Sequence, residues 1–328
     1  MVSSDIRRDT SGRPAGRQSE PGASLRLAYS DANQLLERLK TSDIRAVQLS
    51  PGRLRVDWSG IDLEEMIVSR LSVTCKAVDL ATIEGGTLVF VVRLVVDPEC
   101  GNGADRGRLG IFCPGSSHRR VLEPGWTSLE ICASTDRIAR DGLPVEIFLK
   151  RDRERSDILL EGDLLSRYRK LAGVVLPSKA TRIQRSAMRA AVLDLLTLTA
   201  EHIKHASFET VHSRRKGDRL ATRAMELVGQ DRGYRLGVCD VAKSLGVSRR
   251  ALNYAFQYAL GVSLYRYMLA YRLCAVRRAL QVSSRDMTTV AETARKFGFN
   301  HPGRFSAYYQ SLFCELPSDT LATGDQHL

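Results

Sequence analysis

One pattern occurs twice near the C-terminus, as DVAKSLGVSRRAL at residues 240–252 and as VAETARKFGFN at residues 290–300. Each copy predicts a short helix, a turn at a glycine, and a second helix. In both copies an alanine stands four residues before the turn glycine, as Ala242 before Gly246 and as Ala294 before Gly298. Two helices that cross steeply leave room for only a methyl group at that position. The repeat therefore predicts two helix-turn-helix units.

The second helix of each unit is expected to begin after a capping side chain, Ser248 in the first unit and Asn300 in the second. A side-chain oxygen at the N-cap accepts a hydrogen bond from a backbone N–H that otherwise has no partner. Each unit can place its second helix in a major groove of DNA. Tandem units in one chain therefore indicate a transcription regulator that binds double-stranded promoter DNA.

The charge of the chain agrees with a polyanionic partner. The 328 residues carry a net charge of +12, and residues 211–328 hold 18 Lys and Arg against 9 Asp and Glu. Basic charge that is concentrated in one segment attracts nucleic acid. No apolar run approaches the roughly 18 to 20 residues that span a bilayer, and residues 1–20 are polar and rich in arginine. We expect a cytoplasmic protein with no membrane partner.

The sequence carries no recognisable catalytic or metal-binding pattern. Its seven cysteines are scattered without a CxxC spacing, which argues against a disulfide framework and against a zinc module. His118 is the only histidine before residue 200, whereas a metal enzyme of the cupin type would need two or three histidines and a carboxylate. No nucleophile elbow or phosphate-binding glycine loop occurs. We therefore expect no enzyme activity, no metal and no cofactor.

An α+β fold in three parts is expected. Residues 1–27 lack hydrophobic periodicity and predict a disordered tail. Residues 28–205 predict a β-rich domain with linking helices, and residues 206–328 predict an all-α DNA-binding domain. Short β-branched runs between turn residues predict strands that form a barrel or a sandwich, at residues 44–49, 54–58, 66–73, 87–96, 109–112 and 145–149.

Helical periodicity is predicted at residues 31–40 and again after Ser156. Two apolar stripes follow, one with Leu159, Leu160, Leu164, Leu165, Tyr168 and Leu171, the other with Ala187, Ala191, Leu195, Leu198 and Ile203. Such stripes pack either against the β-rich domain or against a second subunit, and we favour the second subunit. Residues 205–216 lack periodicity and predict a linker.

A helix at residues 264–280 is predicted to connect the two units. At 1.5 Å per residue it is about 25 Å long, which suits two recognition helices about one duplex turn apart. Its arginines are expected at polar positions, namely Arg266, Arg272, Arg277 and Arg278.

The second helix of each unit supplies the candidate DNA contacts. Leu252 and Phe256 are expected to point inward in the first unit, as Phe305 and Tyr309 are in the second. The candidate contacts are Ser248, Arg249, Arg250, Asn253, Tyr254 and Gln257 in the first unit, and Asn300, His301, Gly303, Arg304, Ala307 and Gln310 in the second. Arginine can bond guanine in bidentate fashion, and Asn or Gln can do the same with adenine. Gly303 either lets the phosphate backbone approach closely or marks a weaker unit.

Short motifs accompany the two units, among them Tyr271-Arg272-Leu273, Phe305-Ser306 and Pro317-Ser318. Together with the repeat, they make residues 234–321 similar to the AraC/XylS family of bacterial transcription regulators. The resemblance implies an N-terminal, often cupin-like domain that senses an effector and dimerises. It also implies activation of transcription through contact with promoter DNA and RNA polymerase. Gly237 and Cys314 depart from the family, which usually has a Ser or Thr cap and a glycine at these positions.

Two other functions stay open at this point. The protein could bind DNA without a ligand, as an architectural or constitutive factor. It could also be a cupin-type enzyme fused to a DNA-binding domain, although a single histidine argues against this. Six arginines suit either a small anionic effector or a solvated basic surface, which we favour: Arg93, Arg106, Arg108, Arg151, Arg153 and Arg155.

Overall fold

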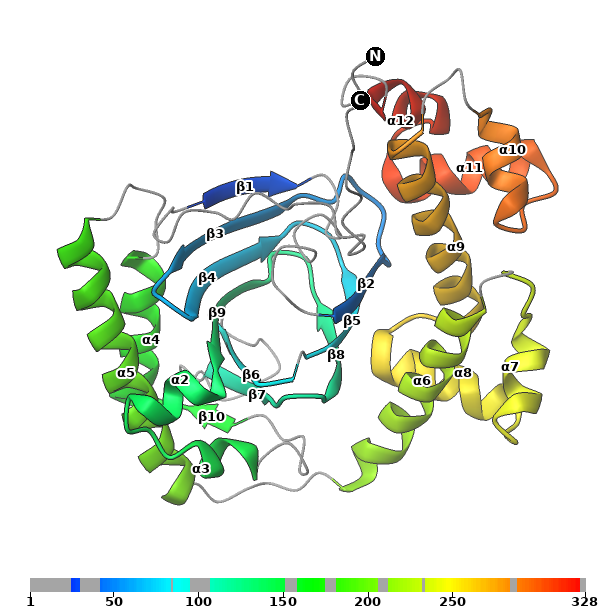
Figure 1. Cartoon of the computed structure of the whole chain (residues 1–328). Coiled ribbons are helices and arrows are strands. Elements are labelled where there is room, and N and C mark those ends of the chain that lie inside the picture. The colour runs from blue at the N-terminus through cyan, green and yellow to red at the C-terminus, as the bar shows by residue number, and fades with distance from the viewer. Residues whose placement is uncertain are drawn as a thin grey trace, which may run out of the picture.

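The structure is a computed structural model, and it describes residues 25–29, 42–83, 85–94, 107–150, 158–174, 181–205, 212–231, 234–283 and 288–324. A β-rich N-terminal part and a helical C-terminal part are distinct in Figure 1, which confirms the α+β fold. Residues 1–24 of the predicted tail and the helix predicted at 31–40 lie outside the described residues. Residues 25–27, also assigned to the tail, begin a strand. The domain boundaries stay a prediction.

The larger sheet is antiparallel, with the strand order β1-β3-β4-β9-β6-β7-β10. Its strands are β1 (Leu25–Tyr29), β3 (Val56–Asp62), β4 (Met66–Val73), β6 (Thr87–Arg93), β7 (Gly107–Phe112), β9 (Thr127–Ser134) and β10 (Ile158–Leu160). The strands predicted at 54–58, 66–73, 87–96 and 109–112 correspond to β3, β4, β6 and β7. β9 and β10 were not among the predicted strands.

The smaller sheet contains β2 (Ser42–Gln48), β5 (Ala77–Thr82) and β8 (Ser117–Leu122), in the order β2-β5-β8. Figure 1 shows the two sheets wrapped around a common interior. Only β2 was predicted from the sequence. β8 has no apolar run, because it carries Arg119 and Arg120 side by side, and the two residues point to opposite faces of the strand.

A buried ion triad joins the two sheets. Arg120 on β8 donates hydrogen bonds to Asp79 on β5 at 2.7 and 3.0 Å, and to Glu130 on β9 at 2.6 Å. Burial alone would disfavour the charged guanidinium, but the two carboxylates raise the pKa of Arg120 above its ordinary value. Burial and the nearby Glu130 raise the pKa of the Cys132 thiol to about 12, so this thiol stays protonated at neutral pH.

Arg93 and Arg108 are half-buried and lie on the same face of the larger sheet as Glu130. They are directly opposite each other on β6 and β7. The Arg93 guanidinium lies 4.8 Å from the centre of the Trp126 ring, and the Nε atoms of both arginines are buried. The preference for a solvated surface therefore holds only in part for these two residues, because each is partly exposed and its Nε atom is buried. Arg106, Arg151, Arg153 and Arg155 lie outside the described residues.

Four helices pack with the larger sheet: α2 (Thr135–Arg140), α3 (Val145–Leu149), α4 (Gly162–Val174) and α5 (Arg182–His205). The strand predicted at 145–149 is wrong, since these residues form α3. Val145 and Phe148 are both buried at a helical spacing of three, and the Phe148 ring meets Phe90 of β6 edge-on at 5.0 Å. A short apolar run has no periodicity that separates a strand from a helix.

Part of each predicted stripe, on α4 and on α5, faces this sheet. Leu165, Tyr168, Leu195 and Ile203 are buried in the same core as Phe90. The preference for a dimer surface is wrong for these positions, because side chains buried within one domain cannot contact a second subunit. The first stripe also begins too early, since residues 158–160 form β10.

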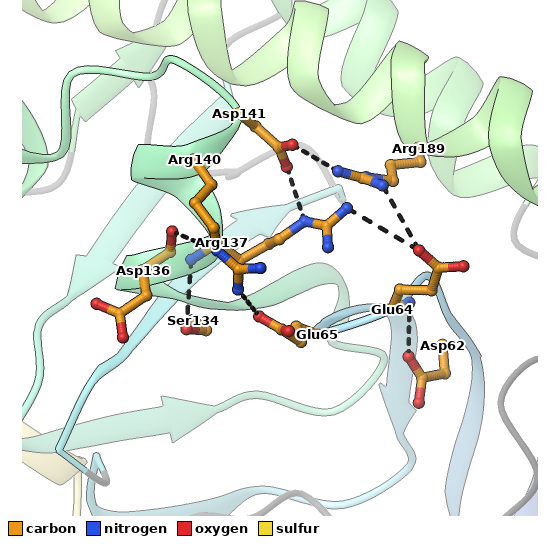
Figure 2. Close-up of polar contacts among 9 residues, drawn as sticks. All are labelled: Asp62, Glu64, Glu65, Ser134, Asp136, Arg137, Arg140, Asp141 and Arg189. Carbon is orange, nitrogen blue, oxygen red and sulfur yellow. Dashed lines mark hydrogen bonds and ion pairs between the residues drawn. The ribbon is translucent and has the colours of Figure 1, made fainter.

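Ion pairs fasten α5 to the turn between β3 and β4, as Figure 2 shows. Arg189 on α5 contacts Asp141 and also Glu64, at 3.7 Å from the latter. Arg137 on α2 contacts the same two carboxylates, at 3.1 Å from Asp141 and 4.0 Å from Glu64. The network joins three segments that are far apart in the sequence, so α5 has a set orientation on the domain.

The C-terminal part consists of α6 (His212–Gln230), α7 (Val238–Ser244), α8 (Arg249–Leu260), α9 (Leu264–Gln281), α10 (Val290–Lys296), α11 (Pro302–Phe313) and α12 (Pro317–Gly324). The linker predicted at 205–216 is wrong from His212 onward, where α6 begins. Ala224 and Met225 of α6 are buried in one core with Phe256 of α8. Within the described ranges, no helix is long and apolar enough to cross a membrane.

Candidate nucleic-acid interface

The two helix-turn-helix units have the same backbone arrangement at their turns. Val247 donates its N–H to the carbonyl of Ala242, and Phe299 donates to Ala294, both at 3.1 Å. The turn glycines adopt φ angles of 65° and 84°. This is the Schellman arrangement, and glycine adopts its positive φ without steric cost. Both predicted turns are confirmed.

The caps of the two second helices differ. Ser248 caps α8, since its Oγ accepts the N–H of Ala251 at 3.1 Å, as predicted. The cap predicted at Asn300 is wrong, because α11 begins at Pro302 and its N-cap is His301. Proline favours the first helical position, where a missing N–H costs nothing, and this places the cap one residue later than expected. The His301 side chain makes no capping hydrogen bond with the described residues.

The first helix of each unit is capped by a carboxylate three residues after its N-cap. Asp240 accepts the N–H of Gly237 at 2.8 Å, so α7 is capped although Gly237 has no side chain. In the second unit Thr289 and Glu292 each accept a backbone N–H from the other, at 3.2 and 3.0 Å. The hydrogen bond from the Thr289 backbone lowers the pKa of Glu292. The unusual residue at 237 therefore leaves the start of the first unit intact.

The candidate contacts of the first unit are all exposed, namely Ser248, Arg249, Arg250, Asn253, Tyr254 and Gln257. Leu252 and Phe256 are fully buried on the opposite face of α8, as predicted. The Arg250 guanidinium lies 5.5 Å from the centre of the Tyr254 ring and donates to its hydroxyl at 3.2 Å. These contacts orient Arg250 at the N-terminal end of the helix.

The candidate contacts of the second unit are exposed as well, namely Asn300, His301, Gly303, Arg304, Ala307 and Gln310. Phe305 and Tyr309 are buried, which confirms the predicted inward face of α11. Arg304 is the cation of this group that is charged at any physiological pH. The second unit therefore offers one permanent positive charge in its candidate set, where the first unit offers two.

Three exposed tyrosines near these helices were missed by sequence reasoning. Tyr258, Tyr265 and Tyr308 are 55%, 58% and 40% exposed. Tyr265 and Tyr308 line a groove of about 270 Å³ between the two units, together with Arg272 and Arg304. A phenol in such a place can donate to a phosphate oxygen or stack on a sugar or base. The sequence gives no signal for them, because a tyrosine on an amphipathic helix is equally compatible with a core position.

Two arginines of α9 bind other segments of the helical domain. Arg272 donates to the carbonyl of Leu236, just before α7, at 2.7 Å. Arg277 is 9% exposed, forms an ion pair with Glu315 at 3.1 Å and lies 4.7 Å from the centre of the Phe313 ring. The expected polar position of Arg277 is therefore wrong. A carboxylate more than thirty residues away makes its burial possible.

Comparisons with known proteins agree with these units. A family model described as "Helix-turn-helix domain" matches residues 241–323. The chain is 36% identical over 88 residues to the probable thc operon regulatory protein of Rhodococcus erythropolis, a match that covers 27% of this chain and 26% of that protein. It is 31% identical over 137 residues to XylDLEGF operon transcriptional activator 2 of Pseudomonas putida, which covers 39% of this chain and 87% of the relative.

A crystal structure of an AraC-type transcriptional regulator from Chromobacterium violaceum is also similar, with 28% identity and a TM-score of 0.31 over 34% of this chain and 97% of the other. The chain thus spans about a quarter of the Rhodococcus protein and most of the shorter Pseudomonas activator. From the paired units, the family model and the match that covers most of the Pseudomonas activator, we conclude that the chain belongs to the AraC/XylS family of DNA-binding transcription regulators.

Proposed function

We propose that the protein activates transcription in the cytoplasm by inserting α8 and α11 into successive major-groove segments of a promoter and by contacting RNA polymerase. One observation carries this proposal: all twelve candidate residues are exposed, while the predicted inward residues of the same two helices are buried, namely Leu252, Phe256, Phe305 and Tyr309. α9 separates the two helices, as Figure 1 shows, and its 18 residues are about 27 Å long at 1.5 Å per residue. The Pseudomonas relative is an operon transcriptional activator, which supports activation.

Footprinting on a promoter fragment tests this mode of binding. We expect the full chain to protect two patches on one side of the duplex, centred about 10 base pairs apart. Because Lys and Arg displace counterions from phosphates, affinity should fall steeply as salt is raised. A single protected patch, or an affinity that does not respond to salt, would contradict the proposal.

We propose that the protein is a homodimer. An exposed apolar stripe on α5 supports this, with Ile183, Ala187, Ala191 and Leu198 at spacings of four and seven residues. Ile183 is 81% exposed and Leu198 is 37% exposed. Sedimentation of Ile183→Glu/Leu198→Glu should show a monomer, because a charge on each facing helix is costly to bury. Ser186→Glu, an exposed position off the stripe, should sediment like the unaltered protein; identical sedimentation of all three would exclude this surface.

A small anionic effector is proposed to bind inside the β-rich domain. The opposed Arg93 and Arg108, with their buried Nε atoms, support an anion as the effector. Titration of small carboxylates and phosphates, with promoter affinity and thermal stability as readouts, should find a compound that changes both. Arg93→Met should abolish that change but not DNA binding in the absence of effector. If no such compound alters promoter affinity, the protein is better described as a ligand-independent DNA binder.

A further inference from the structure

The β-rich domain contacts both candidate recognition helices at their C-terminal ends. The last four carbonyls of a helix have no partner within it. Ala259 is the next-to-last residue of α8 and Leu312 is the next-to-last residue of α11, so both carbonyls belong to this class. In each helix the β-rich domain supplies the missing donor. The permanently charged candidate contacts, Arg249, Arg250 and Arg304, lie in the first turn of these helices, at the opposite end.

At the end of α8 the donor is Arg119 of strand β8. Its Nη1 donates to the carbonyl of Ala259 at 3.0 Å, and its Nη2 donates to the carboxylate of Asp218 on α6 at 2.7 Å. The side chain is only 12% exposed. A cation at this end of a helix is also favoured by the helix dipole. Arg119 therefore ties the smaller sheet to the two helices α6 and α8.

At the end of α11 the donors come from strand β2 and the loop after it. The side-chain nitrogen of Gln48 and the backbone N–H of Gly52 both donate to the carbonyl of Leu312, each at 3.0 Å. Gln48 is 2% exposed. Gly52 has a φ of 135°, and an added Cβ would approach the sulfur of Cys75 to 2.9 Å, so the loop requires glycine here. The end of α11 is thus held by a loop of defined shape.

Apolar packing makes these two contacts parts of one rigid body. Val47 of β2 and Val78 of β5 are buried in the core of the helical domain, with Leu80 and Val121 packed against it. Because β2, β5 and β8 belong to one hydrogen-bonded sheet, the donors at its two edges keep a constant separation. A sheet that holds one end of each helix also limits how far apart the helices can move.

We propose that Arg119 and Gln48 are positioning residues that set the relative placement of α8 and α11, so that the β-rich domain determines which spacing of the two DNA half-sites the protein accepts. This inference rests on the proposed recognition of DNA by these two helices. Arg120, which follows Arg119 on β8, points to the opposite face and joins the buried ion triad. Strand β8 therefore connects the buried ion triad of the β-rich domain directly to the end of α8.

A spacing series tests the inference with the full chain. The preferred bipartite site is first selected from random duplexes with the unaltered protein, and the spacer between its half-sites is then lengthened and shortened by one and two base pairs. We expect the unaltered protein to lose affinity in both directions. In Arg119→Met/Gln48→Met this loss should be about five- to tenfold smaller, as expected when one hydrogen bond is removed from each helix end, and affinity for isolated half-sites should stay within about twofold.

Two further variants make the result decisive. Arg137→Met removes a guanidinium of similar burial, 14% exposed, from the ion-pair network that faces α5 in Figure 2, and it should keep the original spacing profile. Arg119→Lys keeps the charge but cannot donate to Ala259 and Asp218 at the same time as a guanidinium does, so it should give an intermediate spacing profile. It replaces Arg119→Met as the test variant if circular dichroism shows that Arg119→Met is unfolded.

An unchanged spacing profile in the folded double variant, or an equal loss of affinity on half-sites and on every spacer, would overturn the inference. The proposed function fails in a different way. If the unaltered protein selects no duplex at all, DNA recognition by α8 and α11 is wrong, and this inference falls with it before any variant is compared.

Discussion

The two helix-turn-helix units share one turn geometry but differ at the ends of their second helices. α8 begins at the Ser248 cap and ends at Gly261, which has a φ of 68°. α11 begins at His301, whose side chain forms no capping bond with the described residues, and ends at Cys314, which has a φ of 55°. A residue with a side chain is strained in that left-handed conformation. Local interactions therefore define both ends of α8 better than they define the ends of α11.

The second unit compensates with tertiary contacts. Glu315 pairs with the buried Arg277 at 3.1 Å and accepts a hydrogen bond from Thr320 of α12 at 2.7 Å. The Thr320 hydroxyl also lies 2.8 Å from the hydroxyl of Tyr309, and burial raises the pKa of that phenol. One backbone motif can thus be stabilised either by residues of its own segment or by an added helix, and the two solutions should respond differently to substitution.

The largest effect is expected at the ion pair of the second unit. Glu315→Leu leaves the Arg277 charge buried without its carboxylate and should lower the free energy of unfolding by about 3 to 5 kcal/mol. Urea unfolding would measure this, and hydrogen exchange should accelerate in α11 and α12 more than in α8. The double variant Arg277→Met/Glu315→Leu should recover most of the loss, and the exposed Glu226→Leu should change stability by no more than about 0.5 kcal/mol. Equal losses in the single and double variants would show that the charge is not what matters.

The second-largest effect is expected on DNA affinity, and its size should differ between the two units. Arg249→Ala and Arg304→Ala should each cost about 1 to 3 kcal/mol on the selected site if these residues recognise bases. We expect the larger loss for Arg249, because α8 is capped and α11 is not, so its first turn is better ordered. Competition binding on the selected site and on random duplex measures both. An equal loss on random DNA would reassign the arginine to a phosphate contact.

Substitutions at the N-caps of α8 and α11 should change stability in opposite directions. Ser248→Ala removes the acceptor for the Ala251 N–H and should lower stability by about 1 kcal/mol. His301→Ser introduces an acceptor at the uncapped start of α11 and should raise stability by up to about 1 kcal/mol. Thermal unfolding of the two variants, measured side by side, checks the pair. A loss of stability in both would mean that His301 has a structural role other than capping.

The smallest effect is expected at the left-handed residues that end α8 and α11. Cys314→Gly relieves the strain of a positive φ but frees the unfolded chain, so the net gain should be about 0.5 to 1 kcal/mol. Gly261→Ala is the reciprocal change in the first unit and should lose about 1 kcal/mol. Because Cys314 is exposed, little packing is lost with its side chain. Destabilisation by Cys314→Gly would show that its thiol contributes more than the strain costs.

The helical domain was largely predictable from the sequence, in a way that particular residues explain. The turn glycines, the Ser248 cap and the inward Leu252, Phe256, Phe305 and Tyr309 all follow from spacings of a few residues. The error at Asn300 arose because Pro302 sets where α11 begins. The missed helix α6 begins within a polar stretch, and its buried residues become recognisable only next to Phe256. That these surfaces contact DNA stays a prediction.

The β-rich domain was less predictable, because its strands pair over long distances. β4 was predicted with its observed bounds, since five of its eight residues are apolar and the run stands between turns. β8 was missed because its adjacent arginines interrupt the apolar pattern from which strands are predicted. The buried Arg120 depends on Asp79, 41 residues earlier in the chain, and Arg119 depends on Asp218, 99 residues later.

The sequence by itself determined that the chain ends in two helix-turn-helix units with polar outer faces, because helix periodicity, turn glycines and caps act between residues within about four positions of each other. Only the tertiary structure decided that the neighbouring arginines of β8 make different contacts, since Arg119 binds the end of α8 and Arg120 joins two sheets. A charge can be buried only where partners for it converge. That convergence is a property of the folded chain and leaves no local pattern in the sequence.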